Sequence, residues 1–125
     1  MARILIIEDD PDIRSVLRQI LEWEGYTVVD AQDGLQGMRR FLEAPCDLVI
    51  TDLLMPGMSG SAVISKLRRR FPDLKIIAIS GGGIAYGPCG YLDFARELGA
   101  QCTLLKPIRR DTLLEAVRDM LEASS

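Results

Sequence analysis

Short apolar runs alternate along the chain with longer stretches in which apolar residues recur at helical spacing. The runs are apolar throughout, which favours buried strands over helices of this length. They cover residues 3–7, 26–31, 47–51, 74–79 and 102–105. The first helical stripe contains Ile13, Val16, Leu17, Ile20 and Leu21. Later stripes begin near Asp33, Val63, Tyr91 and Leu113. The alternation predicts five strand–helix units.

Capping residues mark where several of these helices begin and end. Asp10 before Pro11 is typical of an N-cap followed by proline in the first turn, and Asp33 stands where it can cap the second helix. Gly25 and Gly99 follow the first and fourth stripes, as expected of residues that end helices. Asp10 is therefore interpreted as a cap.

Strands that are apolar throughout must be covered on both faces, so the pattern predicts an α/β protein with a parallel sheet and helices on each side. No linker, repeat or low-complexity stretch divides the sequence, and residues 1–125 are expected to form a single domain. A doubly wound sheet places its functional site at the carboxyl ends of the strands. The residues that follow each strand are therefore the candidates for chemistry.

The composition excludes several classes of protein. The 125 residues are 48% apolar with a net charge of −3, which excludes disorder. The acidic pI of about 4.9 argues against direct binding to nucleic acid, so the basic clusters at residues 68–70 and 109–110 are interpreted as solvated helix ends. No apolar stretch is long enough for membrane insertion and the N-terminus lacks the features of a signal peptide, so we expect a cytoplasmic protein.

Two residue types narrow the chemistry further. Histidine is absent, which excludes histidine-dependent triads, dyads and metal sites. Cys46, Cys89 and Cys102 are far apart and form no C-x-x-C pair, so reduced thiols are expected rather than a disulfide framework or a zinc site.

Charged and hydroxyl residues follow four of the five predicted strands. Glu8 and Asp9 follow the first strand, Asp52 the third, Ser80 the fourth and Lys106 the fifth. Each alone could be an ordinary loop residue, but together they meet at one edge of a parallel sheet. Clustered carboxylates need a counter-cation, and an all-oxygen set suits Mg²⁺. A cation, a lysine and a hydroxyl together suit a phosphoryl group, with one carboxylate left as nucleophile.

The chain resembles the response-regulator receiver domain of two-component signalling over essentially its whole length. The segments that carry the resemblance are RILIIEDDPDIR, DLVITDLLMPGMSG, SGGG and LLKPI. The family implies a flavodoxin-like (βα)5 fold with strand order 2-1-3-4-5. It also implies Asp52 as the phosphoacceptor, and Asp9, Asp52 and the Leu54 carbonyl as Mg²⁺ ligands, with Glu8 acting through water.

The resemblance further implies that Ser80 is the switch hydroxyl and that Lys106 contacts the phosphoryl group, in a Lys-Pro peptide that is usually cis. Two features depart from the family. Thr103 stands where the family has a switch aromatic, and the segment after Ser80 is longer and rich in glycine. We therefore expect residues 81–98 to form the output element.

The resulting hypothesis is a single-domain response regulator, a signalling module rather than a turnover enzyme. It would take a phosphoryl group from a histidine kinase or a histidine phosphotransfer protein and act on a downstream protein or pass the group on. Three alternatives remain open: a receiver fragment of a longer regulator with an output domain, a phosphorylation-independent interaction module, and a flavin- or nucleotide-binding protein. The acidic first loop counts against the last, because it would repel phosphate.

Overall fold

Five strands form one parallel sheet in the order β2-β1-β3-β4-β5 in the computed structural model, which describes residues 2–53, 60–80 and 99–122. The strands are β1 (Arg3–Ile7), β2 (Thr27–Ala31), β3 (Leu48–Asp52), β4 (Lys75–Ser80) and β5 (Cys102–Leu105). The described helices are α1 (Pro11–Trp23), α2 (Gly34–Glu43), α3 (Gly60–Arg70) and α5 (Arg110–Glu122). The predicted fold class and strand order are confirmed. The glycine-rich segment and the helix expected from Tyr91 lie outside the described residues.

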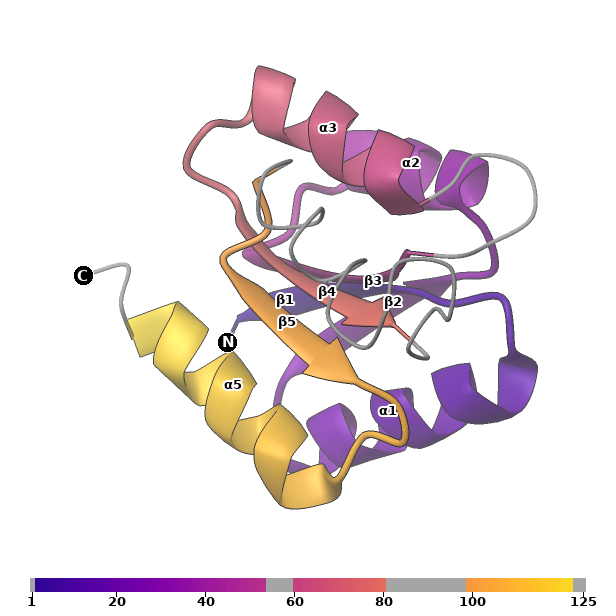
Figure 1. The fold of residues 1–125 in the computed structure, drawn as a ribbon, viewed down its shortest axis with the longest axis vertical. Coiled ribbons are helices and arrows are strands. Elements are labelled where there is room, and N and C mark those ends of the chain that lie inside the picture. Colours follow the sequence, from indigo (N-terminus) through magenta and orange to yellow (C-terminus); the bar gives the residue numbers. More distant parts are fainter. Residues whose placement is uncertain (1, 54–59, 81–98, 123–125) are drawn as a thin grey trace.

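Helices cover both faces of the sheet, with α2 and α3 on one side and α1 and α5 on the other (Figure 1). Successive side chains of β1 point to opposite faces of the sheet, as in any strand, and so pack into the two cores alternately. Leu5 and Ile7 belong to the core beneath α2 and α3, and Ile4 and Ile6 to the core beneath α1 and α5. All four are almost fully buried, which explains why the run is apolar at every position.

The predicted caps of the first two helices are confirmed. The Asp10 side chain accepts hydrogen bonds from the backbone N–H groups of Asp12 and Ile13 at the start of α1. Asp33 caps α2 by accepting from the Gln36 N–H. Gly25, which follows the end of α1, has a φ of 96°, where glycine is favoured. Local sequence signals therefore set these helix boundaries.

Arg68 ties the end of α3 to the chain that leads into β5. Its guanidinium donates to the carbonyl oxygens of Phe71 and Pro72 and, at 2.8 Å, to that of Gly99. Gly99 has a φ of 124°, and a Cβ there would lie 2.9 Å from the Arg68 side chain. The expectation of a solvated cluster at residues 68–70 is thus wrong for Arg68, because the carbonyl groups near it need donors.

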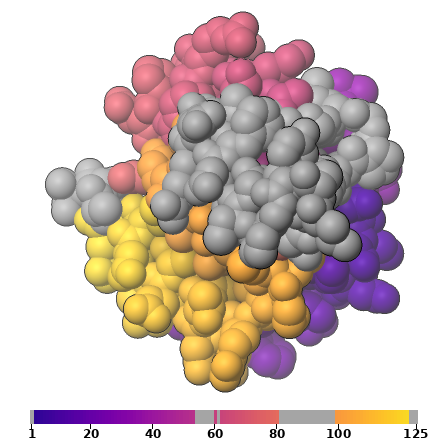
Figure 2. Space-filling model, in the orientation of Figure 1, coloured from indigo at the N-terminus to yellow at the C-terminus, as the bar shows by residue number. Residues whose placement is uncertain are grey.

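The molecular surface carries α3 at the top and α5 below it in the view of Figure 2. None of the described helices has the length and apolar character needed to cross a bilayer. Cys46 is a buried free thiol, and Cys89 lies outside the described residues.

Candidate functional site

The register of the sheet brings the predicted residues to one edge. Asp52 of β3 is level with Ile79 of β4, and Ser80 is level with Leu105 of β5. Since the strands are parallel, the residues that follow β1 and β5 lie at this same edge. Glu8 follows β1 directly, and its N–H donates to the Ala31 carbonyl oxygen at 3.0 Å.

Three carboxylates form the centre of the site. One carboxylate oxygen from each of Glu8, Asp9 and Asp52 lies within 4.8 Å of the others. Glu8 and Asp52 are only 1% and 4% exposed, whereas Asp9 is exposed. The site is therefore a pocket with two buried acids and one acid at its mouth. Leu54, the remaining predicted ligand, lies outside the described residues.

Lys106 reaches two of these acids. Its Nζ lies 2.7 Å from Glu8 Oε1 and 2.7 Å from Asp52 Oδ2. Its backbone N–H donates to the carbonyl oxygen of Ser80 at 2.8 Å, which joins the residue after β5 to the end of β4. The Ser80 side chain is fully buried. The Lys106–Pro107 peptide is cis, as the resemblance implied.

Burial controls the charges in the pocket. Desolvation, reinforced by the neighbouring Asp52 carboxyl, raises the pKa of Glu8 to about 7, although Lys106 acts in the opposite direction. Burial lowers the pKa of Lys106, but its contacts with Asp52 and Glu8 outweigh this and leave the pKa raised. Lys106 is therefore a cation at neutral pH, and it does not fully compensate the acids around it.

The backbone around Asp52 leaves no freedom for a larger residue at position 60. The Leu53 N–H donates to the Ile79 carbonyl oxygen at 3.0 Å, and the Gly60 N–H donates to that of Leu53 at 3.1 Å. A Cβ on Gly60 would lie 1.8 Å from the Asp52 carbonyl oxygen. The first residue of α3 must therefore be glycine, which brings this helix against the end of β3.

The residues present fit a small divalent cation. Within the described part of the chain, both carboxylate oxygens of Glu8 are buried, and Lys106, whose Nζ lies 2.7 Å from Oε1, is the one cation in contact with them. Buried oxygens of this kind need a partner. Oxygen donors in this number are those that Mg²⁺ prefers over softer ligands. The donor set formed by Glu8, Asp9 and Asp52 is thus suited to Mg²⁺.

Two further features lie beside the pocket. An apolar pocket of about 490 Å³ opens between the first turns of α1 and the chain at Lys106. It is lined by Asp12, Ile13, Val16, Leu17, Lys106, Pro107 and Ile108. Thr103, at the position of the family's switch aromatic, is half-buried on β5 and lines a separate pocket of about 340 Å³.

The sequence analysis missed one residue that contacts the site. Arg14 of α1 donates to the backbone carbonyl oxygen of Glu8. The available signal was Asp30, an acid within an otherwise apolar strand, together with Arg14 and Arg18 one helical turn apart.

Comparisons with known proteins agree with this geometry. A family model of the response regulator receiver domain matches residues 4–118. The response regulator receiver protein CpdR of Brucella abortus is 35% identical, with 99% of this chain and 100% of that protein covered. The transcriptional regulatory protein GlrR of Escherichia coli is 33% identical over 99% of this chain, which spans only 27% of that regulator. The solved structure of the response regulator protein TrrA of Thermotoga maritima, in complex with Mg²⁺ and BeF, has a TM-score of 0.84 at 34% identity, covering 97% of this chain and 100% of that one.

Proposed function

The chain belongs to the family of response regulator receiver domains, and we propose that it accepts a phosphoryl group on Asp52 from a histidine kinase or a histidine phosphotransfer protein. Receiver domains are signalling modules of two-component systems. The observation that carries the proposal is the position of Lys106, whose ammonium lies 2.7 Å from Asp52 and from Glu8 in a pocket of three acids. The Lys106 ammonium, together with a divalent cation held by the three acids, would offset the charge of an incoming phosphoryl group.

In the proposed reaction a carboxylate oxygen of Asp52 attacks the phosphorus atom of a phosphohistidine. The new bond joins this oxygen to phosphorus, and the bond between phosphorus and the imidazole nitrogen breaks with its electron pair left on the nitrogen. Asp52 becomes an acyl phosphate. Positioning and charge neutralisation supply most of the catalysis in such transfers, because nucleophile and phosphoryl oxygens are all anionic.

The remaining pocket residues have separate proposed roles. Glu8, Asp9, Asp52 and the Leu54 carbonyl would hold Mg²⁺, which when bound neutralises charge on the phosphoryl oxygens. Lys106 would turn from the Asp52 carboxylate to a phosphoryl oxygen as a point charge. The Ser80 hydroxyl, at the end of the neighbouring strand β4, would donate a hydrogen bond to another of these oxygens and so carry the change into the segment that follows.

Output is proposed to pass through contacts with a downstream protein or through onward phosphotransfer, with residues 81–98 as the output element. A cytoplasmic location belongs to the same proposal. GlrR, in which the matched region is 27% of the protein, supports the alternative of a receiver within a longer regulator. A phosphorylation-independent interaction module is the second alternative, and the experiment below separates it from the main proposal.

Intact-mass analysis after incubation with Mg²⁺ and a small-molecule phosphodonor tests the proposal. The wild-type protein should gain about 80 Da, the mass of one phosphoryl group, and should not do so in the presence of a chelator. Asp52→Asn keeps the shape of the side chain but removes the nucleophile, so the adduct should disappear. Asp10→Asn is the matched control, because Asp10 caps α1, and it should keep the adduct. An adduct that survives in Asp52→Asn would contradict the assignment.

A further inference from the structure

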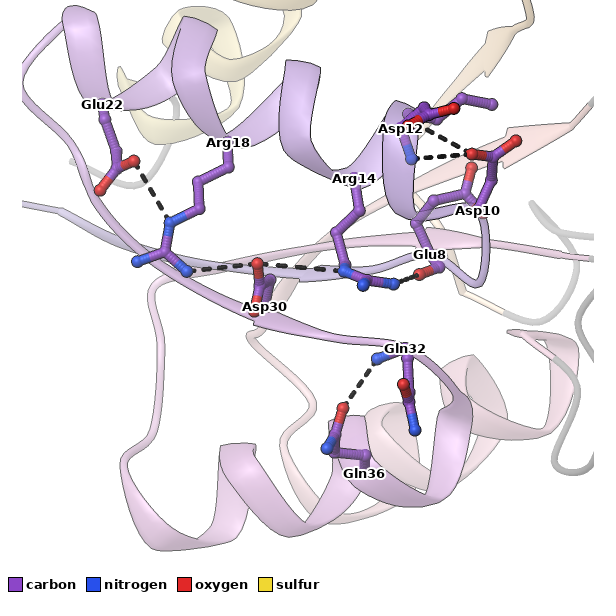
Figure 3. Close-up of polar contacts among 10 residues, drawn as sticks. Glu8, Asp10, Asp12, Arg14, Arg18, Glu22, Asp30, Gln32 and Gln36 are labelled. Carbon is purple, nitrogen blue, oxygen red and sulfur yellow. Dashed lines mark hydrogen bonds and ion pairs between the residues drawn. The ribbon is translucent and has the colours of Figure 1, made fainter.

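A chain of polar contacts connects the end of β1 with α1 and β2 (Figure 3). Arg14 Nη1 donates to the backbone carbonyl oxygen of Glu8 at 2.8 Å, while its Nε lies 4.0 Å from Asp30 Oδ2. The same Asp30 oxygen lies 3.2 Å from Arg18 Nη1. Arg18 Nε in turn donates to Glu22 Oε1 at 3.2 Å. The contacts run from the acidic pocket along one side of α1.

Arg14 contacts the pocket through the backbone of Glu8 and not through its side chain. The Glu8 N–H donates to the Ala31 carbonyl oxygen, and its carbonyl oxygen accepts from Arg14. Both polar groups of this residue's backbone are thus held, one by β2 and one by α1. This carbonyl group belongs to the peptide that joins Glu8 to Asp9. Arg14 therefore restrains the orientation of this peptide plane, which joins the Cα atoms of the two acidic residues.

This restraint matters because the Glu8 side chain has little else to fix it. Within the described part of the chain, no backbone N–H donates to its carboxylate, and the one cation beside it is the Lys106 ammonium. An ion pair to one ammonium constrains direction less than hydrogen bonds from fixed donors. The orientation of the Glu8 and Asp9 carboxylates therefore depends on the backbone that carries them.

We propose that Arg14 is a positioning residue of the acidic pocket, which orients the Glu8–Asp9 peptide so that both carboxylates can hold a divalent cation together with Asp52. Asp30 of β2 contacts Arg14 and also Arg18 in the next turn of α1, but Arg18 does not reach Glu8. The inference rests on the proposed Mg²⁺ site. Residues that orient metal ligands without touching the metal commonly change metal affinity about 10- to 100-fold when they are replaced.

Arg18 provides a matched control for Arg14. Both arginines contact Asp30 from the same face of α1, and both are partly buried. Only Arg14 contacts Glu8. Replacing either with Met keeps the length and apolar stem of the side chain but removes its donors and charge. If the arginines only hold α1 against β2, both replacements should have the same effect. If Arg14 positions the Glu8–Asp9 peptide, only Arg14→Met should weaken Mg²⁺ binding.

The test is titration of the metal-free protein with MgCl₂ by calorimetry, with thermal unfolding in a chelator as the second measurement. Arg14→Met should weaken Mg²⁺ binding about tenfold or more, and Arg18→Met should change it less than about twofold. The two variants should lose similar thermal stability. Arg14→Lys, which keeps the charge and part of the donor capacity, should have an intermediate dissociation constant and guards against misfolding of the Met variant.

Two other outcomes would overturn the inference in distinguishable ways. If wild-type protein binds Mg²⁺ and both variants match it, or if both lose the same affinity, the positioning role is wrong and the proposed function stands. If wild-type protein binds no Mg²⁺, the proposed site fails and the positioning role fails with it.

Discussion

Glu8 is a buried acid with two carboxylate neighbours and a single ammonium beside it. Its pKa is raised to about 7, first by burial and then by Asp52. The native state therefore holds a proton on this group at pH values where the unfolded chain, with a pKa near 4.5, has released it. Because the native state binds more protons in this window, the free energy of unfolding must fall as the pH rises from about 4.5 to about 7.

Glu8→Gln should remove this pH-dependent decrease in the free energy of unfolding in the metal-free protein. Gln resembles the protonated acid and does not titrate, so at pH 8 the variant should be more stable than wild type by an amount on the order of 3 kcal/mol. At pH 4 the two should be nearly equal. Urea unfolding between pH 4 and pH 8 in a chelator measures the difference. Glu115→Gln, at an exposed position of α5, is the control and should follow wild type at each pH.

Much of the candidate site could be predicted at the level of single residues, because the ends of parallel strands meet at one edge of a sheet. The meeting of the strand ends identifies Glu8, Asp52 and Lys106 from the sequence alone. It does not reveal that Glu8 and Asp52 are buried while Asp9 is exposed. It also does not place Arg14 at the site, since Asp30, Arg14 and Arg18 indicate ion pairs but not the contact of Arg14 with the Glu8 carbonyl oxygen.

At the level of elements, the predicted strands all exist, but three begin one residue later than predicted. Tyr26 and Leu74 are apolar, yet their N–H groups bond to the carbonyl oxygens of Leu21 and Phe71, which close the preceding helix and turn. Asp52 and Ser80 are polar, yet both still pair with the neighbouring strand. An apolar run shows which residues are buried, whereas strand limits depend on backbone pairing.

Helix α1 and the turn after β5 form the apolar pocket beside Lys106, and we expect a phosphodonor protein to contact it. Val16 lines this pocket and is 53% exposed, so a replacement there should not disturb the core. Val16→Asp would place a charge at an apolar contact. It should slow phosphotransfer from a cognate phosphodonor protein about tenfold, equivalent to about 1.4 kcal/mol.

Phosphorylation of Val16→Asp by a small-molecule donor should remain at the wild-type rate, because that donor needs no protein contact. Gln19→Asp, an exposed position of α1 that does not line the pocket, is the matched control and should behave as wild type with both donors. Equal losses with both donors would instead indicate damage to the site itself. Radiolabel transfer and intact-mass analysis measure the two rates.

For the whole molecule, the acidic pocket should couple stability to metal. The three carboxylates are held together only in the folded chain, so Mg²⁺ should bind the native state and not the unfolded one. At ten times its dissociation constant Mg²⁺ should add about 1.4 kcal/mol and raise the melting temperature by about 5 °C. Scanning calorimetry at constant ionic strength measures this shift, with NaCl as the control for screening.

Asp9→Asn tests whether the Mg²⁺-induced stabilisation depends on the three carboxylates. It removes one of the mutually repelling charges at the mouth of the pocket, so without metal the variant should be no less stable than wild type. It should also lose most of the Mg²⁺-induced shift. A full shift in this variant would mean that the stabilising ion binds elsewhere on the protein.

The contacts of Arg68 with the carbonyl oxygens near Gly99 have a consequence for how this fold can diversify. Position 80 is held to Lys106 through its backbone, and position 99 is held to α3 through the Arg68 guanidinium. Both attachments are made by residues outside positions 81–98. Lengthening a span between fixed ends carries only a small entropic penalty. Grafting another receiver's segment between positions 80 and 99 should therefore leave these two attachments and the contacts of the acidic pocket in place.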